Sequence, residues 1–309
     1  MIEFDFSRDS NFNSLVLGIG VFDGVHLGHQ KIIQHLKIMA EKNNAKAVAV
    51  TFLPHPRAVL CPDDPPVLLI SPLERIKRLK AAGADGIGVI NFQPCFATLE
   101  PEEFLEQLCD MDFELKGICV GSKWRFGRFG RGDKSLLEKF AQSRKIDFCP
   151  VEEVKINQTL VSSSLLRKLT SQGDLEGVKK LTGFLPILSG QVVHGYKDAS
   201  GKLSAPTANL ILSYGVIPPD GVYAGRCFIE GKELPAVLNI GFSPTFKRDG
   251  QPRRIEVHLI GTSCDLYDKE LDVELVKFIR PEIFFNSIEE LKKQIFQDIS
   301  YAKEVLGIC

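Results

Sequence analysis

Two histidines flank a glycine directly after the first apolar run of the chain. The segment from Gly18 to Gln30 reads GIGVFDGVHLGHQ, with His26 and His29 on either side of Gly28. Glycines let a backbone approach a phosphate closely, and a helix that begins here would offer unpaired N–H groups to an anion. Partly protonated histidines would stabilise the charge that develops at phosphorus during transfer of a nucleotidyl group. The pattern therefore predicts a polyphosphate site with nucleotidyl-transfer chemistry.

Two better-known phosphate-binding patterns fail in this chain. The dinucleotide fingerprint G-x-G-x-x-G starts at Gly18 and Gly20, but Asp23 occupies the third glycine position. The nearest approach to a Walker A loop ends in Lys202, and Leu203 follows where that loop requires serine or threonine. A nicotinamide-dependent oxidoreductase is therefore discounted.

A second set of polar side chains lies in later segments of β character. Thr207 and Asn209 are two residues apart and would share one face of an extended strand, where their oxygens suit Mg²⁺. Glu256 alternates with apolar neighbours and could accept the proton of a hydroxyl that attacks phosphorus. Taken alone, a P-T-A-N segment is most often a turn and a strand glutamate is most often solvated. These residues become informative only beside further motifs.

The first half of the chain alternates apolar runs with amphipathic stretches. Its pattern predicts strands over residues 15–21, 47–52, 86–92 and 117–121, and helices over residues 27–42, 72–83 and 133–144. This order is typical of a Rossmann-like parallel sheet with helices on both faces. Ligands bind at the mouth of such a sheet, which is where the histidine segment falls.

The second half of the chain has a different texture. Two short helices, predicted over residues 163–171 and 175–182, precede closely spaced strands broken by turn residues. That spacing predicts a small antiparallel barrel. The chain ends in a predicted amphipathic helix over residues 287–306, with Ile288 and Ala302 in its buried stripe.

Length and composition restrict the class of protein. A chain of 309 residues suggests two domains, which we place at residues 1–185 and 186–309. A net charge of −1 makes nucleic acid a poor partner. The N-terminus has no signal-peptide pattern, and no run approaches the roughly 20 apolar residues that would span a membrane. The eight cysteines include no C-x-x-C pair, which predicts reduced thiols in a cytoplasmic protein.

Motifs across the first half resemble one family. The segment FDGVHLGHQ is similar to the first motif of the bacterial bifunctional riboflavin kinase/FAD synthetases, whose N-terminal module is an H-x-G-H nucleotidyltransferase; TFLPHPR, RFGRFGRGD and SSSLLR follow in the family's order. The resemblance implies that His26 and His29 stabilise the transferring group. The residues implied to bind ATP and its phosphates are Gly20, Phe22, Asp23, Gly28, Ser163, Ser164 and Arg167. Those implied near the flavin are His55, Pro56, Arg57, Arg125, Phe126 and Gly127.

The second half resembles the riboflavin kinase module of the same family. Similar segments include PTANL, NIGFSPTF and EVHL. The resemblance implies Thr207 and Asn209 at Mg²⁺ and ATP, and Glu256 as catalytic base. The chain departs from the family's usual residues at two dipeptides: Lys123-Trp124 and Ser204-Ala205.

The resemblance implies a bifunctional enzyme of flavin metabolism. Its barrel would phosphorylate riboflavin to FMN with ATP, and its N-terminal domain would adenylylate FMN to FAD, with Mg²⁺ at both sites. Two alternatives stay open: only one module is active, or the protein is a non-catalytic sensor of flavin or nucleotide. The sequence does not predict an oligomeric state.

Overall fold

The computed structural model describes residues 13–193, 208–241, 253–262, 266 and 268–308. It divides into two compact units. The first comprises Met1–Pro66 and Pro72–Ser163, and the second comprises Val67–Ser71 and Ser164–Cys309. The division into domains at residue 185 stays a prediction, and each unit is described by itself.

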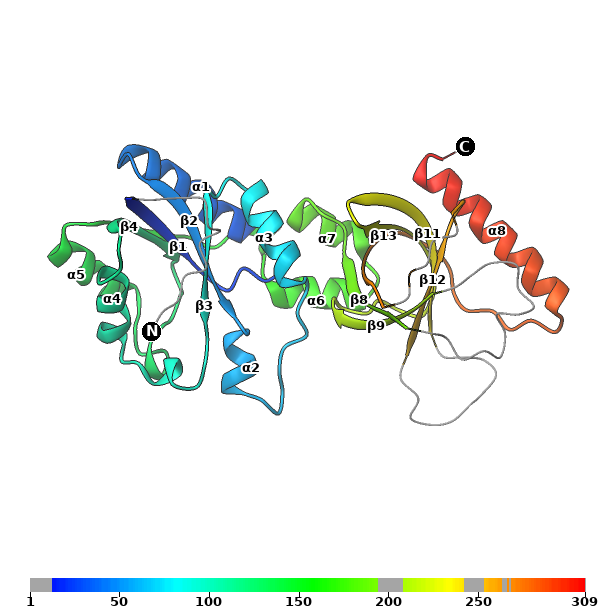
Figure 1. The fold of residues 1–309 in the computed structure, drawn as a ribbon, viewed down its shortest axis with the longest axis horizontal. Helices are drawn as coiled ribbons and strands as arrows, with labels where there is room; N and C mark the ends of the chain where they lie inside the picture. Colours follow the sequence, from blue (N-terminus) through cyan, green and yellow to red (C-terminus); the bar gives the residue numbers. More distant parts are fainter. Residues whose placement is uncertain (1–12, 194–207, 242–252, 263–265, 267, 309) are drawn as a thin grey trace. The chain divides into compact units, whose positions relative to one another are not determined.

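The first unit is built on a five-stranded parallel sheet in the order β3-β2-β1-β4-β5 (Figure 1). Its strands are β1 (Ser14–Ile19), β2 (Lys46–Leu53), β3 (Gly86–Asn91), β4 (Glu114–Gly121) and β5 (Asp147–Val151). Its helices are α1 (Leu27–Lys42), α2 (Pro56–Leu60), α3 (Pro72–Ala81), α4 (Pro101–Cys109) and α5 (Lys134–Arg144). Short segments complete it: η1 (Phe96–Thr98), η2 (Arg128–Gly130), β6 (Lys155–Ile156) and β7 (Thr159–Leu160). The predicted Rossmann-like sheet is confirmed.

Glycines in the sheet let α1 pack closely on one face. A Cβ at Gly18 would lie 2.8 Å from Cδ2 of Leu36, and a Cβ at Gly117 would lie 2.5 Å from Sδ of Met39. Residues next to Gly18 point to the opposite face, where Leu17 joins an apolar cluster that includes Phe104 of α4. The sheet is therefore buried on both faces, as parallel sheets usually are.

Local signals explain which elements of this unit the sequence predicted. Asp133 accepts a hydrogen bond from the N–H of Leu136 at 3.1 Å and so begins α5 where expected. The bounds predicted for α1 agree with Leu27–Lys42. In contrast, β5 and α4 were not predicted, because β5 is only partly buried along most of its length and α4 begins at a glutamate cap.

The second unit contains a closed antiparallel barrel in the order β10-β11-β12-β9-β8-β13, which confirms the predicted architecture. Its strands are β8 (Ile187–Val193), β9 (Ala208–Tyr214), β10 (Gly221–Ile229), β11 (Lys232–Gly241), β12 (Arg254–Leu259) and β13 (Glu270–Arg280). Three helices belong to this part of the chain: α6 (Ser163–Ser171), α7 (Leu175–Thr182) and α8 (Ile288–Leu306).

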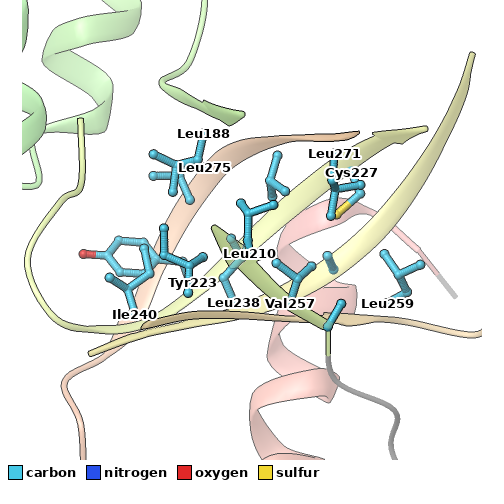
Figure 2. Close-up of a cluster of buried hydrophobic side chains, with 14 of the residues drawn as sticks. Leu188, Leu210, Tyr223, Cys227, Leu238, Ile240, Val257, Leu259, Leu271 and Leu275 are labelled. Carbon is cyan, nitrogen blue, oxygen red and sulfur yellow. The ribbon is translucent and has the colours of Figure 1, made fainter. Parts of the chain in front are cut away.

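Alternate residues of the barrel strands form its core (Figure 2). Leu238 of β11 and Val257 of β12 are fully buried. Both point into the barrel, in the same cluster as Tyr223 and Leu210. Strand residues between these positions face outward because successive side chains alternate across a sheet. Asn209 and Glu256 therefore point away from the core of the barrel and are half-buried on its outer face.

The last helix covers part of that outer surface. Ala302 of α8 is fully buried and packs with Ala224 of β10 and Ile260. The predicted stripe was wrong at its first member, because Ile288 is 45% exposed. No helix in the described ranges has the length and apolar character needed to cross a bilayer.

Candidate active site

The segment between β1 and α1 forms a tight, buried turn. Phe22 and Val25 adopt positive φ angles of 54° and 42°, and the N–H of Val25 donates to the carbonyl of Phe22 at 3.2 Å. Both side chains are fully buried. Positive φ is uncommon for such bulky residues and marks a backbone held by its surroundings. A Cβ at Gly20 would lie 3.0 Å from the ring of Phe22, so the glycine makes room for that ring.

His26 begins α1 as its N-cap. Its Nδ1 accepts a hydrogen bond from the backbone N–H of His29 at 3.3 Å. This accepting nitrogen carries no proton, so the neutral ring holds its proton on Nε2 and offers it as a donor. A Cβ at Gly28 would lie 3.1 Å from Nδ1 of His26. Gly28 therefore leaves room for the ring of His26 at the start of the helix. The N-cap uses only Nδ1 of that ring, so capping does not involve its Nε2–H donor.

The two imidazoles lie face to face. The ring centroids of His26 and His29 are 3.7 Å apart with an interplanar angle of 15°. The rings of Phe22 and His29 are nearly perpendicular, with centroids 5.2 Å apart. Burial lowers the pKa of His26 to about 4. Burial, followed by the charges of His26 and Arg75, lowers the pKa of His29 well below its usual value. Both shifts favour the neutral form of the two rings, in which they act as hydrogen-bond donors or acceptors, whereas the sequence analysis expected partial protonation.

A buried arginine adds positive charge to this site. Arg75 of α3 is fully buried, and its NH1 donates to Oγ1 of Thr51 at 3.2 Å and to the carbonyl of Phe52 at 3.3 Å. Oγ1 of Thr51 in turn donates to the carbonyl of Val21 at 2.9 Å. The chain of bonds links the carboxyl ends of β1 and β2 beside His29. The sequence analysis missed Arg75, although a charge on the same helix face as the buried Leu79 was a possible signal.

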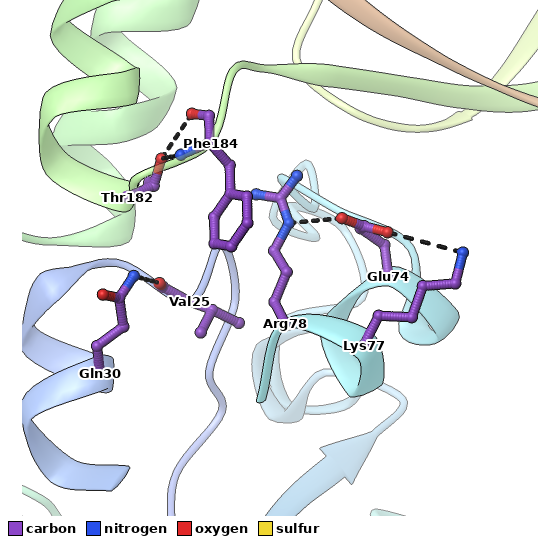
Figure 3. A network of polar contacts seen from close by, with 7 residues as sticks. All are labelled: Val25, Gln30, Glu74, Lys77, Arg78, Thr182 and Phe184. Carbon is purple, nitrogen blue, oxygen red and sulfur yellow. Dashed lines mark hydrogen bonds and ion pairs between the residues drawn. The ribbon is translucent and has the colours of Figure 1, made fainter. Parts of the chain in front are cut away.

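Other polar groups hold the turn in place. Nε2 of Gln30 donates to the carbonyl of Val25 at 2.9 Å (Figure 3). Ser163 donates from Oγ to the carbonyl of Asp23 at 2.8 Å, and Asp23 is itself almost fully buried. Ser163 and Asp23, which the resemblance placed at ATP, are thus brought together although they are 140 residues apart.

Two further residues implied at the phosphates, Ser164 and Arg167, belong to the second unit. Ser164 is exposed. Nε of Arg167 donates to the carbonyl of Val67 at 2.6 Å. Their part in an ATP site stays a prediction.

The PHPR segment after β2 forms the short helix α2. His55 is its N-cap and accepts at Nδ1 from the N–H of Arg57 at 3.0 Å, while Pro56 occupies the first turn. Arg57 is exposed and pairs with Asp64. These contacts explain the local fold, and binding of flavin by this segment stays a prediction.

The segment after β4 is an aromatic cluster closed by a narrow loop. Phe126 is buried, and its ring stacks on Trp124 with centroids 4.9 Å apart. Gly127 has a φ of 67°. Arg125 is exposed and lies 3.4 Å from a carboxyl oxygen of Asp133. The ring of Phe126 is thus part of the core, and binding of flavin by Arg125, Phe126 and Gly127 stays a prediction.

One departure from the family pattern has a visible partner. Nζ of Lys123 lies 2.6 Å from a carboxyl oxygen of Glu153. The lysine side chain is 74% exposed, so this ion pair is in contact with solvent. The second departure, Ser204-Ala205, lies outside the described residues.

A row of polar side chains crosses the outer face of the barrel. Glu256 on β12 is directly opposite Asn209 on β9 and Asn239 on β11. Burial raises the pKa of Glu256, while Arg254 and a hydrogen bond with Asn239 oppose the shift. A carboxyl held this way is a stronger base than an exposed one, as proton abstraction from a hydroxyl requires. Thr207, the other residue implied at the metal, lies outside the described residues, and Asn239 was not singled out in the sequence analysis.

The described side chains provide no ready-made cluster for a metal. Among them, no group of three or more histidine, cysteine, aspartate or glutamate residues could hold an ion. The row on the barrel instead offers one carboxylate and two amide oxygens. Oxygen donors of this kind suit a hard cation that is shared with nucleotide phosphates.

Comparison with known proteins assigns both units to one group of enzymes. The family model described as FAD synthetase matches residues 8–165, and that described as riboflavin kinase matches residues 182–306. A curated bifunctional riboflavin kinase/FMN adenylyltransferase from Bacillus subtilis is 36% identical over 288 residues, which cover 92% of this chain and 90% of that protein. This chain belongs to the bifunctional riboflavin kinase/FMN adenylyltransferase family. Members of this family use ATP.

Further relatives agree over nearly the whole length. The riboflavin kinase/FMN adenylyltransferase of Escherichia coli K12 is 35% identical over 295 residues and covers 95% of this chain and 93% of its own. A crystal structure described as a macrolide-efflux protein from Streptococcus pneumoniae aligns with a TM-score of 0.79 at 27% identity, over 97% of this chain and 96% of that one. Its description names a different function from those of the curated relatives. The two family models and the curated relatives agree on the riboflavin kinase/FMN adenylyltransferase function, and we follow them rather than the description of the crystal structure.

Proposed function

We infer that this protein catalyses two ATP-dependent steps in flavin metabolism: phosphorylation of riboflavin to FMN and adenylylation of FMN to FAD. The observation that carries this inference is the match of both family models along one chain. The paired histidines at the start of α1 and Glu256 on the barrel support it, because each offers the group that its reaction needs. Within the cell, we propose a cytoplasmic location.

In the adenylylation step, a phosphate oxygen of FMN attacks the α-phosphorus of ATP and pyrophosphate leaves. Nε2–H of His26 is the proposed donor to the oxygens that gain negative charge at this phosphorus. The stacked His29 fixes the orientation of that ring. The N–H groups of the first turn of α1 and the charge of Arg75 favour an anion at the same place.

In the kinase step, the 5′-hydroxyl of riboflavin attacks the γ-phosphorus of a second ATP. Glu256 is proposed to accept the hydroxyl proton, and its raised pKa improves it as a base. Asn209 and Thr207 are the proposed oxygen ligands of Mg²⁺. The ion would neutralise charge on the phosphates, and ADP would be the second product.

The test is a chromatographic assay of the purified protein with ATP, Mg²⁺ and either riboflavin or FMN. We expect FMN from riboflavin and FAD from FMN. Conversion of FMN alone would show that only the first unit is active. Absence of product from both flavins would overturn the proposal and favour a non-catalytic sensor.

Two variants assign the reactions to separate residues. His29→Ala should slow FAD formation on the order of a hundredfold or more and leave riboflavin phosphorylation nearly unchanged. Glu256→Ala should instead slow riboflavin phosphorylation and leave the conversion of added FMN to FAD nearly unchanged. Each variant is the matched control for the other, since both carry one side-chain truncation at a candidate site. Equal loss of both reactions in either variant would contradict the assignment.

A further inference from the structure

Two cysteines that are distant in the sequence meet in the first unit. Cys119 on β4 and Cys149 on β5 are directly opposite each other in the register of the two parallel strands. Neighbouring strands are about 4.8 Å apart, which is within the range of Cα separations that a disulfide can bridge. The 29 residues between them explain why C-x-x-C spacing gave no sign of the pair.

Helix α1 covers this pair with a histidine. Cys119 is buried, and its Sγ lies 3.6 Å from the carbonyl oxygen of Ile32. Cys149 is half-buried, and the imidazole of His35 forms a hydrogen bond with it. The same face of β5 carries Asp147, whose carboxylate accepts hydrogen bonds from Lys42 of α1 and from the C-cap residue Asn43.

The two thiols differ in their tendency to ionise. A hydrogen bond from Cys119, together with the charge of His35 and its hydrogen bond, lowers the pKa of Cys149 to about 6 against the opposing effect of burial. The hydrogen bond with Cys149, then burial, raises the pKa of Cys119. The opposite charges of Lys42 and Asp147, which form an ion pair nearby, offset each other. Cys149 is thus the thiol that ionises more readily and the more accessible sulfur, and Cys119 is its less acidic neighbour on the adjacent strand.

We propose that Cys149, Cys119 and His35 form a thiol modification site in which Cys149 reacts with peroxides and Cys119 then closes a disulfide. The Cys149 thiolate attacks one oxygen of hydrogen peroxide, hydroxide leaves, and Cys149 becomes a sulfenic acid. The sulfur of Cys119 then attacks the sulfenic sulfur and displaces water, with its proton transferred to the departing oxygen. The peroxide is reduced by two electrons and the two thiols are oxidised to one disulfide.

The experiment oxidises the full-length protein with hydrogen peroxide and maps the products by mass spectrometry of non-reduced peptides. We expect a loss of two hydrogen atoms from the intact protein and a linked peptide pair that contains Cys119 and Cys149. Reduction with dithiothreitol should restore the starting mass. A disulfide that joins other cysteines, with Cys119 and Cys149 both still free, would overturn the proposal.

Single substitutions separate the roles of the two sulfurs. In Cys119→Ser, oxidation should stop at a sulfenic acid on Cys149, which dimedone traps. In Cys149→Ser, dimedone should not label Cys119. Cys95→Ser is the matched control because Cys95 is exposed and outside the cluster, and it should leave the linked pair unchanged. Dimedone on Cys95 or Cys61 of the Cys119→Ser variant, with none on Cys149, would also overturn the proposal.

Alkylation with iodoacetamide tests the assignment without relying on a disulfide. At pH 6 about half of a thiol with a pKa near 6 is thiolate, against less than about 1% of an unperturbed thiol. Lower intrinsic nucleophilicity reduces this advantage to about tenfold. Cys149 should therefore be alkylated about tenfold faster than a short unstructured cysteine peptide in the same tube, and His35→Gln should lower that ratio. A rate equal to that of the peptide in the native protein would contradict the assignment.

Discussion

The histidine pair shows how burial changes what a residue can do. Exposed imidazoles at a phosphate site would share a proton with water, but burial lowers the pKa of both His26 and His29 and so favours their neutral form. Neutral His26 still donates from Nε2, because the helix cap fixes its tautomer. Residue types and spacing therefore predicted the place of the site, whereas the charge state required knowledge of its neighbours.

The base assigned to the kinase step makes a prediction about pH. Glu256 must be deprotonated to accept a proton, and burial raises its pKa. FMN formation should therefore fall, as the pH is lowered, at a higher pH than an ordinary glutamate would give. Asn239→Ala removes the hydrogen bond that opposes this shift, so its acid limb should move to still higher pH. The measurement is the initial rate of FMN formation against pH in the native protein and the variant.

The control for that profile is FAD formation from FMN by the same two proteins. It should show the same acid limb in both, because Asn239 belongs to the barrel and the histidine pair belongs to the other unit. An acid limb for FMN formation that does not move in Asn239→Ala would count against Glu256 as the titrating base.

Residues that the sequence analysis missed share one property. Arg75 and Cys149 take their chemistry from tertiary neighbours: Arg75 from Thr51 and the strand ends, Cys149 from Cys119 and His35. Neither residue lies in a short motif with its partners. Spacing along the chain therefore could not reveal them, whereas it revealed the histidine pair, whose members are one helical turn apart.

At the scale of elements, strong local signals predicted the structure well. The bounds of α1 were correct because a cap, a periodic apolar stripe and a polar stop coincide. β5 has only its last residue fully buried, and the sequence gives little alternation there. The stripe of α8 failed at Ile288 because a helix end can extend beyond the surface that it covers. Apolar periodicity predicts which face of a helix is apolar, but not how much of that face is buried against the rest of the protein.

The start of α1 allows the cap and the catalytic role of His26 to be separated. His26→Ala removes both, and loss of the N-cap should reduce the free energy of unfolding by about 1 kcal/mol. His26→Asn restores a good cap but not the ring donor. We expect both variants to slow FAD formation on the order of a hundredfold, while only the alanine variant is destabilised.

The stability measurement can be confined to the first unit. Trp124 is the only tryptophan in the sequence and lies in that unit. Its fluorescence in a urea titration therefore reports the unfolding of the part that contains α1. Full FAD-forming activity in His26→Asn would mean that the ring serves as a cap alone.

The whole molecule combines a parallel sheet and a barrel whose candidate catalytic groups do not overlap. His26 and His29 belong to the first compact unit, and Glu256 belongs to the second. Both architectures were predicted from the sequence, because predicted strands that alternate with helices indicate a parallel sheet, whereas short strands in close succession indicate an antiparallel barrel. The sequence pattern did not predict how the SSSLLR motif is divided: Ser163 belongs to the first unit, whereas Ser164 and Arg167 belong to the second.

Separate sites make a prediction for mixtures of variants. His29→Ala should produce FMN but little FAD, and Glu256→Ala should consume FMN but not make it. An equimolar mixture should therefore convert riboflavin to FAD, with a lag while FMN released by one variant accumulates for the other. The chromatographic time course measures both flavins, and added FMN should abolish the lag. If the mixture formed no FAD although Glu256→Ala still converted added FMN, the FMN made by His29→Ala would have to stay bound to that variant, and the two units could not act as independent enzymes.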